Sequence, residues 1–517
     1  MIHYLRMPKN NNMNKQQNSI IIIGAGFAGL SAGIYARMNG YKTRIFEMHD
    51  KPGGLCTSWV RNGFTIDGCV HWLVGSSLKS SFHQFWEEVG VVPGRKFIDM
   101  DIYFRHEATD GRIVTFYSDI DRLEKHLAEF SPADAVLIRE FTNGIRMCLV
   151  FDQPAKNTPF PFRIWKKIKM IMTMVMNGKN MKRWMNTTMI DFTGKLKDPV
   201  LKEAFNEIWI PEFSMFFMLF TFAWLHNKNA GYPVGGSMPL SRALEKRYLD
   251  LGGEISYRSK VEKIITEDGK ATGVLLSDGS FHAAGRVISA ADGHATLFGM
   301  LDGKYLTPAI RQQYEKWPTF HSLLFIGLGV QRTFEEIPRM VSGLSFPLPQ
   351  PVKIAGKTIN RLQVHPCHHD PTLAPEGKTV LAVMLESDYG WWKNLAGDRN
   401  AYLREKETAL SKVIELLELR FPGISGQVEM TDVATPLTFE RYTGNWKGSF
   451  EGWLITPENS GVVMKPMDQT IPGLNNFYMC GQWVEPGGGL PTGVSSGRRL
   501  IRAICREDRK NFSASRV

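Results

Sequence analysis

Residues 20–47 of this 517-residue chain constrain its fold more than any other segment. Residues 20–23 form a run of four isoleucines, which is typical of a strand buried on both faces of a parallel sheet. Residues 27–39 carry apolar side chains at helical spacing up to Gly40, a residue suited to cap a helix. A second short strand, residues 42–46, ends in Glu47. Between the first strand and the helix lies the pattern G-x-G-x-x-G, formed by Gly24, Gly26 and Gly29.

Each residue of this unit has a physical task in binding a dinucleotide. Gly24 permits a tight turn, Gly26 lets the backbone approach a pyrophosphate, and Gly29 brings helix and strand together. The helix start, which includes Ala28, presents unpaired N–H groups and the positive end of the helix dipole to the phosphates. Glu47 accepts hydrogen bonds from ribose hydroxyls and repels a 2′-phosphate. We therefore predict FAD or NAD in preference to NADP.

The residues after this unit favour FAD. Residues 47–54 (EMHDKPGG) and 63–68 (GFTIDG) resemble the phytoene desaturase family of flavoproteins, which includes carotenoid desaturases, carotenoid isomerases and retinol saturase-like enzymes. The resemblance implies that Gly53 and Gly54 lie along the diphosphate and ribityl chain of FAD. Many relatives have Arg directly after the paired glycines, whereas this chain has Leu55, so a charged phosphate contact must be absent or come from another residue.

Two further blocks extend the resemblance from about residue 18 to residue 506. Residues 232–237 (YPVGGS) and a strand from Val261 resemble the return of the chain into the nucleotide domain, where the backbone at Val261 contacts adenine. Residues 473–497 resemble the C-terminal flavin motif, with Gly481, Gly489 and Val494 as its cofactor contacts.

This C-terminal block predicts a strand over residues 477–480, a glycine-rich turn, and a helix that begins near Thr492 or Gly493 and runs through Arg506. The start of this helix is expected to face the flavin, where its N–H groups stabilise the negative charge of the reduced ring. A flexible loop at residues 487–489 is the alternative interpretation.

These motifs predict an α/β fold with a Rossmann-type FAD-binding domain of the FAD/NAD(P)-linked reductase kind and an interleaved α+β substrate domain. Residues 18–80, 230–300 and 465–510 are expected to build the FAD-binding domain. Residues 81–229 and 301–464 are expected to build the substrate-binding domain.

Residues 153–190 contain eight basic residues, seven methionines and no Asp or Glu. A cationic, amphipathic helix bearing Trp165 and Trp184 suits the surface of an anionic membrane. The alternative is a solvated basic helix that packs on the protein through its methionines. Nucleic acid is not expected as a partner, because the segment matches no recognisable nucleic-acid module. Residues 215–225 are apolar but too short to span a bilayer, so we expect a buried helix or the wall of an apolar tunnel.

Candidate catalytic side chains are few. His71 follows the second FAD block, and Glu485 adjoins the Pro-Gly-Gly-Gly turn; either residue is a candidate acid or base, although a structural role for His71 remains open. The stretch from His365 to Asp370 is rich in His and Cys, but its spacing does not match zinc sites, and we predict no metal. No Ser-His-Asp arrangement is evident from residue order.

The function implied by the resemblance is FAD-dependent desaturation, saturation or isomerisation of carbon–carbon bonds in an apolar polyene or isoprenoid-type lipid. Two alternatives remain open: a flavin oxidase of the amine-oxidase type, and a non-catalytic protein that binds FAD or a lipid. No second G-x-G-x-x-G follows a strand, so a dedicated NAD(P) domain is not expected and the electron partner stays open.

Composition and charge agree with a globular protein at an anionic surface. Lys and Arg exceed Asp and Glu by 62 to 51, a net charge of +11. The six cysteines are scattered, and the first nineteen residues lack the apolar core of a signal peptide. We therefore expect a cytoplasmic protein at the inner face of the membrane.

Overall fold

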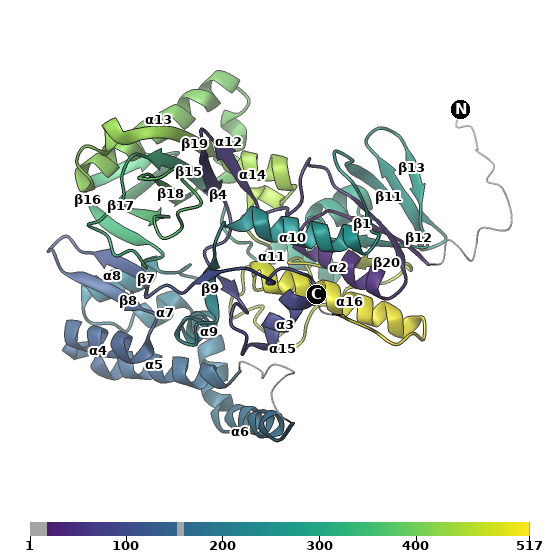
Figure 1. Ribbon diagram of the computed structural model, residues 1–517, viewed down its shortest axis with the longest axis horizontal. Coiled ribbons are helices and arrows are strands. Elements are labelled where there is room, and N and C mark those ends of the chain that lie inside the picture. The colour runs from purple at the N-terminus through teal and green to yellow at the C-terminus, as the bar shows by residue number, and fades with distance from the viewer. Residues whose placement is uncertain (1–17, 152–159, 516–517) are drawn as a thin grey trace.

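The computed structural model describes residues 18–151 and 160–515. Figure 1 shows a nucleotide-binding lobe on the right, built on a parallel sheet, and a second lobe on the left that combines a large sheet with a group of helices. The predicted α/β class with a Rossmann-type sheet is confirmed.

The nucleotide-binding lobe is centred on a five-stranded sheet in which every pairing is parallel. The central strand is fully buried along residues 20–23, as its run of isoleucines predicts, and pairs with strands from two distant parts of the chain. The strands lie in the order β10 (Glu254–Ser256), β2 (Lys42–Phe46), β1 (Ser19–Ile23), β14 (Arg286–Ser289) and β20 (Phe477–Met479).

Small residues let the helices of this lobe pack closely. Helix α2 (Phe27–Met38) lies against α10 (Ser237–Asp250) and α16 (Gly489–Glu507). A Cβ atom on Gly497 of α16 would lie 2.7 Å from the backbone nitrogen of Ala32 in α2, so only glycine permits this approach. The three predicted segments of the FAD-binding domain therefore meet around one helix.

The same lobe carries two additions. Strands β11 (Val261–Glu267), β12 (Lys270–Leu276) and β13 (Phe281–Ala283) form an antiparallel meander. Helix α3 (Ser81–Glu88) lies beyond the predicted boundary at residue 80, yet its Trp86 is buried in the same core as β1, and the Glu88 carboxylate pairs with Arg498 of α16 at 2.8 Å.

The second lobe contains a mixed seven-stranded sheet backed by α13 (Arg399–Arg420). Its core buries Trp392 of α12 (Tyr389–Leu395) and Leu417. The strand order is β19 (Val428–Ala434), β15 (Leu323–Val330), β18 (Thr379–Glu386), β17 (Lys357–Pro366), β16 (Leu344–Ile354), β7 (Ile102–Glu107) and β8 (Ile113–Tyr117).

Helices pack beside the β7 and β8 edge of this sheet (Figure 1). Helix α9 (Met215–His226) is the predicted apolar helix, and most of its side chains are buried. Around it lie α4 (Ile120–Phe130), α5 (Ala135–Cys148), α6 (Phe160–Met185), α7 (Met189–Thr193) and α8 (Pro199–Glu207).

The remaining short elements lie outside the two large sheets. Strand β9 pairs with both β5 and β6, and β3 pairs with β4. Within the described ranges, no helix combines the length and the apolar character needed to cross a membrane. The bounds of the short elements are β3 (Ser58–Arg61), β4 (Phe64–Asp67), β5 (Leu73–Val74), β6 (Phe97–Ile98), β9 (Ala230–Pro233), α11 (Pro308–Lys316), α14 (Pro436–Thr443) and α15 (Gly461–Met464).

Candidate cofactor and substrate site

The turn between β1 and α2 has the geometry of a phosphate cradle. Gly24 has a φ of +95°, a conformation that favours glycine, and a Cβ on Gly29 would lie 2.0 Å from the Gly24 carbonyl oxygen. A Cβ on Gly26, in contrast, would meet only the Gly53 oxygen at 3.8 Å. No side chain caps α2, so the amide groups of its first turn, including that of Ala28, remain free for an anion.

Glu47 closes one side of this cradle. Its buried carboxylate accepts hydrogen bonds from the backbone nitrogens of Ala25 at 2.6 Å and His49 at 2.8 Å. Burial raises the pKa of Glu47, and these amide hydrogen bonds act in the opposite direction. The Ser259 amide donates to the Glu47 carbonyl oxygen at 2.8 Å. This hydrogen bond brings the strand that begins at Val261 close to Glu47, the residue predicted to bind the ribose.

The paired glycines lie directly against the first turn. Gly53 forms a parallel bridge with Gly26, and its amide donates to the Ala25 carbonyl oxygen at 2.9 Å. Gly54 has a φ of +61°. Leu55 follows in a partly buried position, so this turn has an apolar side chain where relatives carry a cation.

The C-terminal turn reaches the same place from the other end of the chain. A Cβ on Gly481 would lie 3.1 Å from the Ala28 side chain, and Val494 is fully buried. Helix α16 begins at Gly489, so the predicted start at Thr492 or Gly493 was wrong. Gly488, with a φ of +71° that favours glycine, caps the helix without a side-chain hydrogen bond, and this conformation lets the helix begin earlier.

These features fit FAD. Two helix starts without side-chain caps, a buried acid at the end of the second strand, and a glycine whose Cβ position is open supply the anion and ribose contacts that a dinucleotide needs. The predicted cofactor residues come together here: Gly24, Gly26, Ala28, Gly29, Glu47, Gly53, Gly54, Leu55, Val261, Gly481, Gly489 and Val494.

The two predicted acid–base residues lie in different surroundings. Glu485 pairs with Arg499 at 3.1 Å and accepts a hydrogen bond from the Ser495 hydroxyl. Burial raises its pKa, whereas Ser495 and Arg499 lower it. Glu485 is therefore already engaged within its own turn and helix.

His71 is partly buried and lines a small cavity. Its ring centroid lies 4.9 Å from that of His365, and burial together with His365 and His369 lowers the His71 pKa to about 3. The imidazole is therefore neutral near pH 7 and is no source of a proton there. The catalytic role of His71 stays a prediction.

The His- and Cys-rich stretch from His365 to Asp370 contributes to the lining of this cavity. The open volume of the cavity is about 30 Å³ for the centre of a water molecule, more than the roughly 10–15 Å³ that one water needs. His71, Tyr232, His365, Cys367 and His369 contribute to its lining. Within residues 18–151 and 160–515, no three His, Cys, Asp or Glu side chains gather as a metal site.

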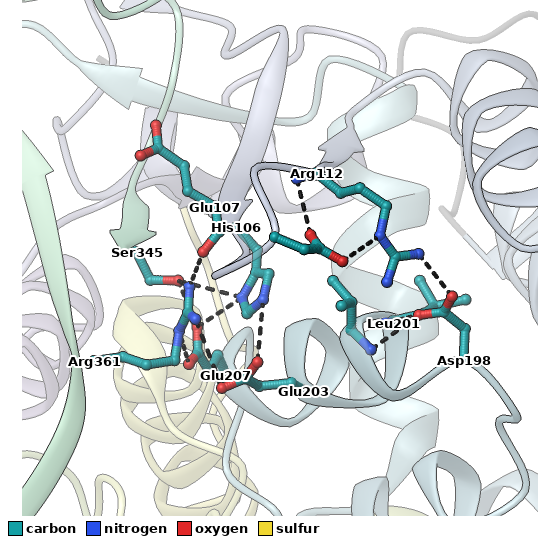
Figure 2. Close-up of polar contacts among 11 residues, drawn as sticks. His106, Glu107, Arg112, Asp198, Leu201, Glu203, Glu207, Ser345 and Arg361 are labelled. Atoms are coloured by element: carbon teal, nitrogen blue, oxygen red, sulfur yellow. Dashed lines mark hydrogen bonds and ion pairs between the residues drawn. The ribbon is translucent and has the colours of Figure 1, made fainter. Parts of the chain in front are cut away.

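A second polar cluster lies in the other lobe and brings together Ser, His and Glu (Figure 2). The His106 Nδ1 lies 3.0 Å from the Glu207 carboxylate, which also accepts from the Ser345 hydroxyl and pairs with Arg361 at 2.6 Å. Ser345 and His106 are 1% and 0% exposed, and the hydroxyl hydrogen is directed to the carboxylate. The cluster therefore ties β7, β16 and β17 to α8 and offers no nucleophile to a substrate.

An aromatic wall leads away from the C-terminal turn. A Cβ on Gly487 would lie 3.5 Å from the Phe217 ring, which stacks on Phe213 with centroids 4.8 Å apart. Phe213 in turn packs on Trp209, and Phe220 continues the partly exposed side of α9. The wall joins the predicted flavin turn to an apolar surface, which is what a long hydrocarbon substrate requires.

Glu451 was not singled out from the sequence. Its carboxylate accepts a hydrogen bond from the Gly489 amide at 3.0 Å, at the first residue of α16. In the sequence, Glu451 could have been noticed as the single acid in the otherwise apolar stretch from Phe450 to Ile455.

Helix α6 carries its apolar side chains outward. Ile164, Ile168, Ile171 and Val175 recur at helical spacing and are 43%, 51%, 52% and 78% exposed. Trp184, on another side of the helix, is buried in the helical core. Residues 153–159 of the predicted basic segment lie outside the described residues.

Comparison with known proteins identifies relatives along nearly the whole chain. The family model described as flavin containing amine oxidoreductase matches residues 27–505. The chain is 26% identical to phytoene desaturase (neurosporene-forming) of Rhodobacter capsulatus, covering 94% of this chain and 93% of that protein. It is 23% identical to a chloroplastic prolycopene isomerase of Daucus carota, covering 92% of this chain and 78% of that protein.

A solved structure shares the fold at lower identity. Cyclohexylamine oxidase from Brevibacterium oxydans superposes with a TM-score of 0.58 at 14% identity, covering 95% of this chain and 99% of that one. This similarity supports the fold.

Proposed function

Because the chain belongs to the flavin-containing amine oxidoreductase family, we propose that it uses FAD to desaturate, saturate or isomerise carbon–carbon bonds of an apolar polyene or isoprenoid-type lipid. The observation that carries the proposal is the contact between the cofactor turn at Gly487 and the aromatic wall that starts at Phe217. Relatives named as a phytoene desaturase and a prolycopene isomerase support the choice of a polyene.

The residues of the chain position the cofactor and keep water away from it. The free amides at the start of α2 would hold the diphosphate, and Glu47 would hold the ribose. The start of α16 would serve the ring, and Phe217 would contact the substrate. Bound there, FAD supplies two-electron chemistry at carbon, for which the protein needs no nucleophile of its own.

The wall contributes through shape and low polarity. The partly exposed Phe217 ring, which stacks on the buried Phe213, would present a flat, apolar face to a conjugated chain and offer it no competing hydrogen bonds. Binding then depends on the apolar area buried, at roughly 25 cal/mol per Å². This mode of binding selects for long hydrocarbons rather than for small polar amines.

The test is incubation of the flavin-loaded protein with a panel of polyenes and isoprenoid lipids, with and without oxygen, followed by mass analysis. We expect a loss or gain of two mass units, or an unchanged mass with a shifted retention time for isomerisation. Hydrogen peroxide released with small amines would indicate the amine-oxidase alternative. A flavin that dithionite reduces but that no lipid reoxidises or perturbs would indicate a non-catalytic protein.

We also propose that α6 rests on an anionic membrane, at its cytoplasmic face. The outward row of Ile164, Ile168, Ile171 and Val175 lies between exposed lysines such as Lys169 and Lys179, the arrangement of an interfacial helix. The six cysteines are all free thiols, as expected for a reducing compartment. The end of α6 joins the aromatic wall, because the Ser214 hydroxyl before α9 donates to the Met185 carbonyl oxygen at 2.9 Å.

Liposome binding tests this placement. Changing both Ile168 and Val175 to Glu should reduce co-sedimentation with anionic vesicles by at least about tenfold, because two apolar contacts are replaced by like charge. Val136→Glu on α5 is the matched control, since Val136 is 85% exposed and lies outside the row. Unchanged binding by the double variant would contradict the placement of the membrane surface.

A further inference from the structure

Glu451 lies against the glycine turn that starts α16. Its Oε1 accepts the Gly489 amide at 3.0 Å, and its Oε2 lies so close to Gly488 that a Cβ there would be 1.6 Å away. A hydrogen bond to Cys56 and burial raise the pKa of the Cys69 thiol, with smaller contributions from the charges of Asp67 and Glu451.

The backbone that carries Glu451 is fixed. The Asn445 side-chain amide donates to the Ser449 carbonyl oxygen at 2.6 Å, and the Ser449 hydroxyl donates to the Glu451 carbonyl oxygen at 2.7 Å. The Asn445 side-chain oxygen accepts from Gln482 at 2.9 Å, which ties this loop to the C-terminal turn. The carboxylate therefore keeps its place relative to α16.

No cation among the described residues pairs with Glu451. The apolar side chains of Phe217 and Ile455 lie beside the nearby Gly487, whose Cβ position is 3.5 and 3.3 Å from them. Glu451 as a whole residue is partly buried. Desolvation raises its pKa to about 7, and the Gly489 amide opposes this rise.

We propose that Glu451 is the acid–base group of the flavin site, which exchanges with the lipid the proton that accompanies hydride transfer. This inference rests on the proposed function. In desaturation, one C–H bond gives its hydrogen and electron pair to the oxidised flavin, and the neighbouring carbon gives a proton to the Glu451 carboxylate. The electron pair left behind forms the new C=C bond, so two hydrogens and two electrons leave the lipid. Saturation is the reverse and requires the carboxylic acid.

Neighbouring acid–base groups are less suited to this role. Glu485 is paired with Arg499, and the pKa of His71 is about 3. The pKa of the Cys69 thiol is raised well above the usual value by its hydrogen bond to Cys56 and by burial, so it is protonated throughout the neutral range. A group that ionises near pH 7 exchanges protons most efficiently at that pH.

The first test reads the flavin and needs no lipid. Titrating the holoprotein from pH 5.5 to 8.5 should change the absorbance of the bound flavin with a midpoint near pH 7, because a charge forms beside the ring. Glu451→Gln should abolish this change, whereas Cys69→Ala and Glu458→Gln, an exposed acid of the same loop, should retain it.

The second test reads turnover. Glu451→Gln should lower kcat by about 100-fold or more with little change in KM, and should remove the pH dependence near 7. A wild-type rate that rises through pH 7 indicates a base and hence desaturation; a rate that falls indicates an acid and hence saturation.

The outcomes separate the two proposals. Flavin-loaded Glu451→Gln protein with wild-type kcat and an unchanged flavin titration would overturn the role of Glu451, whatever the substrate. A wild type that acts on no lipid but titrates near pH 7 would support the placement of Glu451 and contradict the proposed function. Should Glu451→Gln fail to load flavin, Glu451→Asp decides, because an identical midpoint in Asp and wild-type proteins would overturn the inference.

Discussion

The two glycine-rich helix starts use the same structural feature for different charges. Helix α2 follows β1 and α16 follows β20, and in neither helix does the N-cap residue supply a capping side chain, so the amides of each first turn need another partner. At α2 these amides stay open, and the nearby Glu47 is held by the backbone of Ala25 and His49. At α16 the first amide is already bound to the Glu451 carboxylate. The start of α2 suits the permanent negative charge of a diphosphate. The start of α16 suits a carboxylate whose charge changes with its protonation state.

The largest expected effect comes from Gly29, which lets α2 approach β1. Gly29→Ala places a methyl group 2.0 Å from a backbone oxygen that cannot move aside, so we expect protein that neither loads flavin nor melts cooperatively. Flavin absorbance and circular dichroism measure this. Gly178→Ala is the control, because Gly178 is also helical but has nothing within 4 Å of its Cβ position. A yellow, cooperatively folding Gly29→Ala protein would contradict the close-packing role.

Gly26→Ala separates cofactor binding from folding. The added Cβ meets no protein atom closer than 3.8 Å, so the apoprotein should melt within about 1 °C of wild type. The same methyl group displaces the diphosphate from the amides, and FAD affinity should fall by about 100-fold. Calorimetric titration with FAD checks this, and unaltered affinity would place the diphosphate elsewhere.

Glu47→Gln is expected to act more weakly. The amide side chain retains one acceptor oxygen but loses the charge that strengthens the ribose hydrogen bonds, so FAD affinity should fall by about tenfold. Glu254→Gln on the adjoining strand β10 replaces an exposed acid and should leave the affinity unchanged. Equal affinities for wild type and Glu47→Gln would remove Glu47 from the cofactor site.

The smallest effect concerns the stability of flavin-free protein. The Glu451 pKa is raised to about 7 in the folded state, so the folded state binds more protons than the unfolded one between pH 4.5 and 7. Wild-type stability is therefore lost as pH rises through this window and is not regained above it. Glu451→Gln should be more stable than wild type by about 1–2 kcal/mol at pH 8, after allowance for partial solvent exposure, and similar to it at pH 5. Urea unfolding at both pH values measures the difference; equal stabilities at pH 8 would contradict it.

Local pattern accounts for what the sequence predicts well. Four isoleucines, spaced glycines and a terminal acid define one strand, turn and helix within 28 residues, so their geometry follows from short-range sterics and hydrogen bonding. The start of α16 was predicted three residues late because Gly488 and Gly489 read as a loop, whereas their positive φ values form the cap.

Long-range placement accounts for what the sequence does not show. Glu451 reaches the cofactor site only because Asn445 links its loop to the turn at Gln482. The Ser345, His106 and Glu207 cluster joins residues up to 239 positions apart, and no local spacing reveals it. Burial lowers the pKa of His71 and raises that of Glu451. It is likewise a property of the assembled lobes.

The nucleotide-binding lobe is completed by a segment far along the chain. Strand β20 completes the parallel sheet beside β14, and α16 packs on α2, about 460 residues away in sequence. A nascent chain on the ribosome therefore lacks one wall of the pocket until α16 emerges. Loading of the coenzyme has to wait for this helix, and its loss would leave an apoprotein with exposed core that is open to aggregation and proteolysis.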